Sequence, residues 1–206
     1  SANNALLWGA RGTGKSSLIK AVHGALCDDH PHLLMIEIHR EDISSLSKLL
    51  SILREDNSRF FILFCDDLSF ETTDTCYKSL KALLEGGLEG RPKNIIFYAT
   101  SNRRHLLDLV NHEEQYSDMR ELSDVTEERV SLSDRFGLWL GFHSCDQATF
   151  LEIIDAYSNK FGIKIPKSHL HSAAIEWSIT RGARSGRVAW QFIQEIAGQE
   201  GINFPE

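Results

Sequence analysis

Several features of membrane-bound and secreted proteins are missing from this sequence. No stretch approaches the ~20 consecutive apolar residues that span a bilayer, and no basic segment followed by an apolar one stands at the N-terminus. The cysteines are few, far apart and without C-x-x-C spacing, so neither a zinc site nor a disulfide framework is expected. We therefore expect a cytoplasmic protein without membrane contact. Its cysteines, Cys27, Cys65, Cys76 and Cys145, are expected to be buried or incidental thiols.

An excess of positive charge is also missing. The 206 residues include 22 Lys and Arg against 29 Asp and Glu, which gives a formal net charge of -7. This charge repels nucleic acids, so a nucleic-acid contact would have to be local, at the cluster Arg181, Arg184 and Arg187. Nucleic-acid binding is therefore an alternative that the net charge disfavours. Apolar residues at 42% and charged residues at 25% are ordinary for a globular protein.

Strand and helix signals alternate along the first part of the chain. Short apolar runs predict strands at residues 5–8, 33–38, 60–65, 94–99 and 137–142. Apolar residues three and four positions apart predict intervening helices at residues 17–26, 44–54 and 73–84. Uninterrupted apolar strands are typical of a parallel sheet covered on both faces. We therefore predict a three-layer α/β/α domain with a five-stranded parallel sheet, whose ligand lies beyond the carboxyl ends of the strands.

The later part of the chain shows helix signals alone. They predict helices at residues 146–160, 167–179 and 185–197. This change predicts an α/β domain at residues 1–144 and a small C-terminal α-helical domain at residues 145–206. Before it, residues 105–131 are rich in acidic side chains and have no strand signal, so we expect a solvated loop or mobile insertion whose role stays open.

A glycine-rich turn stands between the first predicted strand and the first predicted helix. Residues 9–16 fit the pattern G-x-x-x-x-G-K-[S/T] of a phosphate-binding P-loop, also called Walker A. Lys15 would reach the β and γ phosphates and the Ser16 hydroxyl would bind Mg²⁺, whereas an ordinary glycine-rich turn is the disfavoured alternative. The predicted cofactor-binding residues are Gly9, Ala10, Arg11, Gly12, Thr13, Gly14, Lys15, Ser16 and Ser17.

A P-loop alone does not distinguish kinases, GTPases and ATPases. The distinction therefore depends on the polar residues that follow two other predicted strands. Asp66 and Asp67 end the third strand in the form of a Walker B site. Asp66 would hold Mg²⁺ through water, and Asp67 would orient and deprotonate the attacking water. Asn102, after the fourth strand, could hydrogen-bond the γ phosphate or the water. The alternative is a strand that runs into an acidic turn.

With these motifs the chain resembles the AAA+ ATPases along nearly its whole length, which implies ATP as the nucleotide. In that family a polar residue where Asn102 stands is called sensor 1. Residues 132–136, LSDRF, resemble the motif that carries the arginine finger, which makes Arg135 the candidate. The alternative for Arg135 is an ion pair with an acidic neighbour such as Asp134 or one in the insertion.

The predicted helical domain carries a further motif of this resemblance. Residues 182–184, GAR, are similar to sensor 2, which makes Arg184 the lid residue that reaches the γ phosphate, with Arg187 as a competing candidate. More narrowly, the segments NNALLWGARGTGKSSL, LSDRFGLWLGF and RGARSGRVAWQF look like an uncharacterised bacterial AAA+-type predicted ATPase family, known as a domain of unknown function.

Some features depart from the family pattern. Many members have Asp-Glu in Walker B, whereas the shorter Asp67 holds water further back, so hydrolysis is expected to be slow. Residues 39–42, HRED, lack the aromatic-apolar-Gly pore loop of members that thread proteins, which disfavours unfoldase activity. Family members usually carry upstream residues that contact adenine, and a truncated or processed chain would account for a start so near the first strand.

The resulting expectation is a Mg²⁺-dependent ATPase that assembles with itself and hydrolyses ATP at a subunit interface to remodel or recruit an unknown protein partner. One alternative is a nucleotide-dependent switch with negligible turnover. Another is a P-loop small-molecule kinase, although no acceptor-binding signature is visible.

Overall fold

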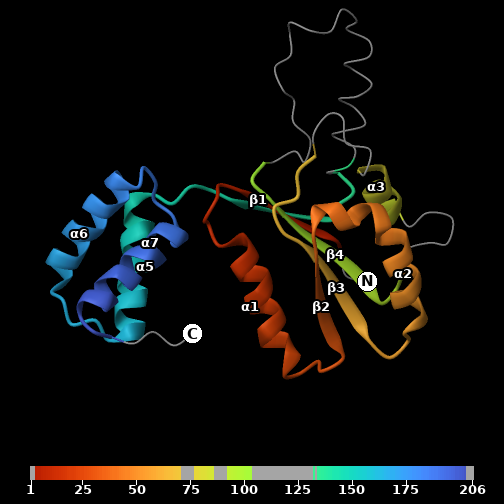
Figure 1. Cartoon of the computed structure of the whole chain (residues 1–206), viewed down its shortest axis with the longest axis horizontal. Coiled ribbons are helices and arrows are strands. Elements are labelled where there is room, and N and C mark those ends of the chain that lie inside the picture. The colour runs from red at the N-terminus through yellow and green to blue at the C-terminus, as the bar shows by residue number, and fades with distance from the viewer. Residues whose placement is uncertain (1–2, 71–76, 86–91, 104–131, 133, 203–206) are drawn as a thin grey trace, which may run out of the picture. The chain divides into compact units, whose positions relative to one another are not determined.

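The computed structural model describes residues 3–70, 77–85, 92–103, 132 and 134–202 (Figure 1). The chain forms two compact units, one within residues 1–9 and 15–141 and the other within residues 10–14 and 142–206. These units are groups of contacting residues, and the domain boundary at residue 144 stays a prediction. The acidic segment 105–131 lies outside the described residues.

The first unit is built on a five-stranded sheet in the order β2-β3-β4-β1-β5. Neighbouring strands run parallel, which confirms the predicted P-loop-type α/β fold. Each predicted strand is present within a residue or two of its expected ends, because each is an apolar run bounded by polar residues. The strands are Ala5–Gly9 (β1), Leu33–Ile38 (β2), Phe60–Cys65 (β3), Ile95–Ser101 (β4) and Leu138–Phe142 (β5).

Helices connect these strands. They are Lys15–Cys27 (α1), a 3₁₀ helix at Arg40–Ser45 (η1), Leu46–Glu55 (α2) and Tyr77–Glu85 (α3). The helix predicted at residues 44–54 is thus preceded by a 3₁₀ segment, which the Asp42 carboxylate stabilises by accepting a hydrogen bond from the His39 N–H at 2.9 Å. Of the helix predicted at residues 73–84, residues 73–76 lie outside the described part of the chain.

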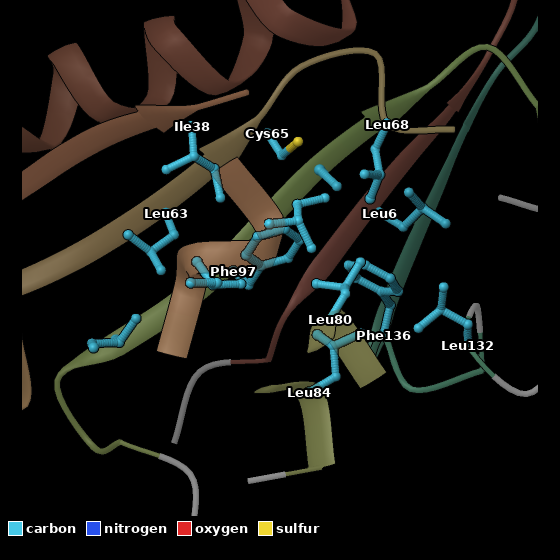
Figure 2. Close-up of a cluster of buried hydrophobic side chains, with 14 of the residues drawn as sticks. Leu6, Ile38, Leu63, Cys65, Leu68, Leu80, Leu84, Phe97, Leu132 and Phe136 are labelled. Atoms are coloured by element: carbon cyan, nitrogen blue, oxygen red, sulfur yellow. The ribbon is translucent and has the colours of Figure 1, made fainter. Parts of the chain in front are cut away.

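The helices cover both faces of the sheet and so create three layers. On one face, Leu80 and Leu84 of α3 pack with Leu63 and Phe97 of the central strands in one buried cluster (Figure 2). On the opposite face lies α1, whose Lys20 Nζ is 5.8 Å from the centre of the Phe64 ring. Because side chains alternate along a strand, consecutive residues at the carboxyl end of β4 also face opposite layers.

The second unit contains a three-helix cluster of Gln147–Phe161 (α5), Lys167–Thr180 (α6) and Gly186–Gln199 (α7). Asp146 and Ser185 cap α5 and α7, since their side chains accept hydrogen bonds from the N–H groups of Thr149 and Val188. Phe150, Leu170 and Phe192, among others, form its buried core. Among the described residues no helix has both the length and the apolar character needed to cross a membrane.

Candidate functional site

Three adjacent strands deliver the predicted site residues of the first unit. The order β3-β4-β1 places the carboxyl ends of these strands side by side. Asp66 and Asp67 follow β3, Asn102 follows β4, and Lys15 opens α1 after the turn that leaves β1. The sheet thus brings together residues from distant parts of the sequence.

Lys15 is the buried cation of this group, with 7% of its surface exposed. Its Nζ donates hydrogen bonds to the Gly9 carbonyl at 2.9 Å and to Asn102 Oδ1 at 3.2 Å. Burying an ammonium group is costly unless its protons are hydrogen-bonded. These bonds hold its positive charge at the carboxyl ends of β1 and β4.

Asp66 accepts hydrogen bonds from two hydroxyl groups. Ser16 Oγ donates to Asp66 Oδ1 at 2.6 Å, and Thr100 Oγ1 donates to the same oxygen at 2.5 Å. Burial is the largest influence on this carboxyl and opposes its ionisation, but the hydrogen bonds from Ser16, Thr100 and the Asp67 N–H, with the charge of Lys20, outweigh it and lower the pKa of Asp66. Asp66 is therefore held as a carboxylate next to the Ser16 hydroxyl.

Asp67 has a left-handed backbone with φ of 53°. Aspartate tolerates this region better than most residues do, and such conformations concentrate at functional sites. Its N–H donates to Thr100 Oγ1 at 2.9 Å, and its Oδ1 accepts a hydrogen bond from Asn102 Nδ2 at 2.5 Å. These contacts orient the Asp67 side chain toward the residue that follows β4.

Together these contacts form one continuous hydrogen-bonded chain, which runs through Ser16, Asp66, Thr100, Asp67, Asn102 and Lys15. One member, Thr100, joins the two carboxylate residues and was not among the predicted site residues. A polar residue at the end of an otherwise apolar strand was the available signal, although threonine is also an ordinary strand former.

The glycine-rich loop belongs to the second unit over residues 10–14, which the sequence did not predict. Gly12 and Gly14 have φ values of 75° and 94°, a region that glycine adopts without strain. The Gly12 carbonyl accepts a hydrogen bond from the Arg187 N–H at 3.2 Å, and a Cβ on Gly12 would lie 3.1 Å from Arg187 Cβ. Thr13 Oγ1 donates to the Ala10 carbonyl at 2.9 Å.

The remaining predicted residues differ in their surroundings. Arg135 Nη2 forms an ion pair with Glu85 Oε1 of α3 at 2.5 Å. The predicted alternative for Arg135 was an ion pair with Asp134 or with an acidic residue of the insertion. The insertion lies outside the described residues. Arg184 is exposed, and its charge acts on the Cys145 thiol, whose pKa burial and Asp146 raise. Arg11 and Ser17 are exposed.

The residues of the first unit fit a magnesium nucleotide. A serine hydroxyl and an ionised carboxylate are oxygen donors of the kind that Mg²⁺ prefers, and a buried ammonium group suits phosphate oxygens. In the described part of the chain no three His, Cys, Asp or Glu residues are grouped to hold a metal ion. Mg²⁺ usually takes one or two carboxylates and completes its shell with water and substrate phosphates, so the observed donors match that mode.

Solved structures share the fold of the chain. A variant of RuvB from Thermotoga maritima is 14% identical, with a TM-score of 0.54 over 93% of this chain and 61% of that one. The ORC2 protein of Aeropyrum pernix, solved as ADPNP-ADP complexes, is 13% identical, with a TM-score of 0.54 over 95% of this chain and 62% of that one. The chain thus spans about three fifths of the length of these structures.

Comparison with curated proteins gives no match. A family model described as protein of unknown function DUF815 matches residues 1–200, nearly the whole chain. The chain therefore belongs to this DUF815 family.

Proposed function

We propose that the chain is a Mg²⁺- and ATP-binding module of AAA+ type that hydrolyses ATP. The observation that carries the proposal is the hydrogen-bonded chain from Ser16 through Thr100 to Lys15, at the carboxyl ends of three adjacent strands. Open parallel sheets bind ligands at this edge. The fold shared with ORC2, which was solved with nucleotides, supports the proposal.

In this proposal the P-loop holds the phosphates. Backbone N–H groups of residues 9–16 and the N-terminus of α1 bind phosphate oxygens, and the Lys15 ammonium group binds the β and γ phosphates. Ser16 and Asp66 would hold the metal ion, Asp66 through water. The bound Mg²⁺ would neutralise charge on the phosphates during their hydrolysis.

Asp67 and Asn102 act on the water in the proposed reaction. Asp67 accepts the proton of the attacking water, and Asn102 orients the water or the γ phosphate. The observed bond from Asn102 Nδ2 to Asp67 Oδ1 supports this pairing, because it fixes the direction of the Asp67 carboxylate.

The arginines complete the proposed site. Arg135 acts in a neighbouring copy as an arginine finger, so we propose a homo-oligomer in the ATP-bound state. Of the sensor 2 candidates, we favour Arg187 over Arg184, because the Arg187 backbone is hydrogen-bonded to the P-loop carbonyl of Gly12. The ATPase cycle would remodel or recruit a protein partner.

A nucleotide switch with negligible turnover is the second candidate. Asp67 is short, and its Oδ1 already accepts the Asn102 amide at 2.5 Å, which leaves less of the carboxylate for a water proton. Single-turnover hydrolysis at high protein concentration separates the two functions, because a switch would bind ATP without releasing phosphate.

The test of the whole proposal is removal of the Lys15 charge. Lys15→Ala should leave the fold intact but lower ATP affinity about 10- to 150-fold, since hydrogen bonds to charged groups contribute ~1.5 to 3 kcal/mol. Lys48→Ala is the control for the loss of a lysine charge, because Lys48 is exposed on α2 and takes no part in the contacts of the site. Calorimetry that finds wild-type ATP affinity in a folded Lys15→Ala protein would overturn the assignment.

A further inference from the structure

Thr100 contacts both residues of the candidate Walker B pair. It is 1% exposed, and its Oγ1 donates a hydrogen bond to Asp66 Oδ1 while accepting one from the Asp67 N–H. Its carbonyl also accepts a hydrogen bond from the Leu68 N–H at 2.7 Å. One buried residue of β4 thus fixes the chain at three successive positions after β3.

The two oxygens of the Asp66 carboxylate differ in their hydrogen bonds. Hydrogen bonds from Ser16 Oγ, Thr100 Oγ1 and the Asp67 N–H all end on Oδ1. Within the described ranges no hydrogen bond ends on Oδ2. Protein donors therefore occupy one oxygen of the carboxylate, and the other keeps its lone pairs for a cation or its water shell.

We infer that Thr100 is a positioning residue for Mg²⁺: it holds the Asp66 carboxylate by Oδ1, so that Oδ2 would remain available to the ion or to its water shell. This inference rests on the proposed function and deepens it. Groups that hydrogen-bond a metal-binding carboxylate set its orientation, and their removal typically lowers metal affinity or activity about 10- to 100-fold. The effect of Thr100 is thus transmitted through Asp66.

A merely structural role would have a different signature. Thr100→Val keeps the branched shape and removes the hydroxyl, whereas Thr100→Ser keeps the hydroxyl and removes a methyl group. Ser101→Ala is the matched control: Ser101 is the next residue of β4, is 0% exposed, and accepts a hydrogen bond from the Arg103 N–H at 3.2 Å. Because side chains alternate along a strand, Ser101 faces the layer opposite to Thr100.

The experiment measures ATP affinity by calorimetry in the whole chain, with Mg²⁺ and with EDTA. In Thr100→Val the increase in ATP affinity caused by Mg²⁺ should be about 10- to 100-fold smaller than in the wild type. The ATP affinity in EDTA should be unchanged. Thr100→Ser and Ser101→Ala should keep the gain. Thr100→Ala removes the same hydroxyl and serves if Thr100→Val does not fold.

A double variant tests the route through Asp66. Thr100→Val added to Asp66→Asn should lower the Mg²⁺-dependent gain no further than Asp66→Asn alone, because the two changes remove one coupled element. A wild-type gain in folded Thr100→Val, or additive losses, would overturn the inference and leave the proposed function intact. A wild-type chain that binds no ATP in either buffer would overturn both.

Discussion

Arg135 and Glu85 form an ion pair with 2.5 Å between Nη2 and Oε1. Glu85 is the last residue of α3, and Arg135 lies shortly before β5, so the pair joins two separate segments of the first unit. Their side chains are 27% and 42% exposed, and a pair so open to water typically contributes ~0 to 1 kcal/mol. The ion pair with Glu85 is therefore weak enough for Arg135 to exchange it for another anion.

Neutralising Glu85 tests whether this pair restrains the proposed finger. In Glu85→Gln, Arg135 loses this one ion pair, which should make it easier to transfer to the γ phosphate of a neighbouring copy. We expect ATP hydrolysis at fixed protein concentration to rise by up to about fivefold, the equivalent of ~1 kcal/mol. Glu55→Gln, at the last residue of α2, is the control for the loss of a charge at a helix end. A fall in hydrolysis would mean that Glu85 positions Arg135 for catalysis instead of restraining it.

Removing Arg135 itself should separate binding from hydrolysis. Arg135→Ala should bind ATP normally and lose ~10³- to 10⁵-fold in hydrolysis, the typical contribution of an arginine finger. Mixing this variant with Lys15→Ala should restore some activity, because one subunit supplies an intact P-loop and the other an intact finger. No recovery in a mixture shown to co-assemble would argue against action in the neighbouring copy, and full activity of Arg135→Ala alone would end the idea.

Asp66 and Asp67 should differ when each is neutralised. Asp66→Asn should weaken the Mg²⁺ dependence of ATP binding, because the Asp66 carboxylate, ionised by its hydrogen bonds to Ser16 and Thr100, is the proposed metal-holding group. Asp67→Asn should keep Mg²⁺-dependent binding while phosphate release falls ~10²- to 10⁴-fold, the usual contribution of a general base. Binding by calorimetry and phosphate release would show whether the variants differ. Equal behaviour would mean that the proposed division of roles is wrong.

The sequence was sufficient to predict the fold because each strand is an apolar run with polar ends. Residues 33–38 and 60–65 have the ends that were predicted. Most residues of the candidate site could also be predicted, since Lys15, Ser16 and Asp66 occur in motifs whose local pattern indicates their chemical role. Whether these residues bind nucleotide stays a prediction.

Pairings between distant segments could not be predicted in the same way. Glu85 occurs at a helix end without any motif, and its contact with Arg135 depends on how the segments pack. Threonine is common in strands, so the sequence does not distinguish a site role of Thr100 from an ordinary role in the strand. The grouping of residues 10–14 with α7 likewise depends on backbone contacts, because the bond from the Arg187 N–H to the Gly12 carbonyl involves no side chain.

The contact between the P-loop and α7 gives a last prediction, from two glycines of one helix. A Cβ on Gly186 would lie 3.3 Å from the Gly12 carbonyl oxygen, whereas a Cβ on Gly198 would meet nothing within 4 Å. Replacing a helical glycine with alanine stabilises a helix by up to ~1 kcal/mol where there is room. Gly198→Ala should therefore raise the free energy of unfolding by about 0.5 to 1 kcal/mol and leave ATP affinity unchanged.

In Gly186→Ala the methyl group presses on the carbonyl that accepts the Arg187 N–H, so this gain in the free energy of unfolding should shrink or reverse. If the loop binds phosphate as proposed, its displacement should also weaken ATP binding. Denaturant unfolding and calorimetry on both variants make the comparison, and equal effects would show that the contact with α7 does not constrain the P-loop.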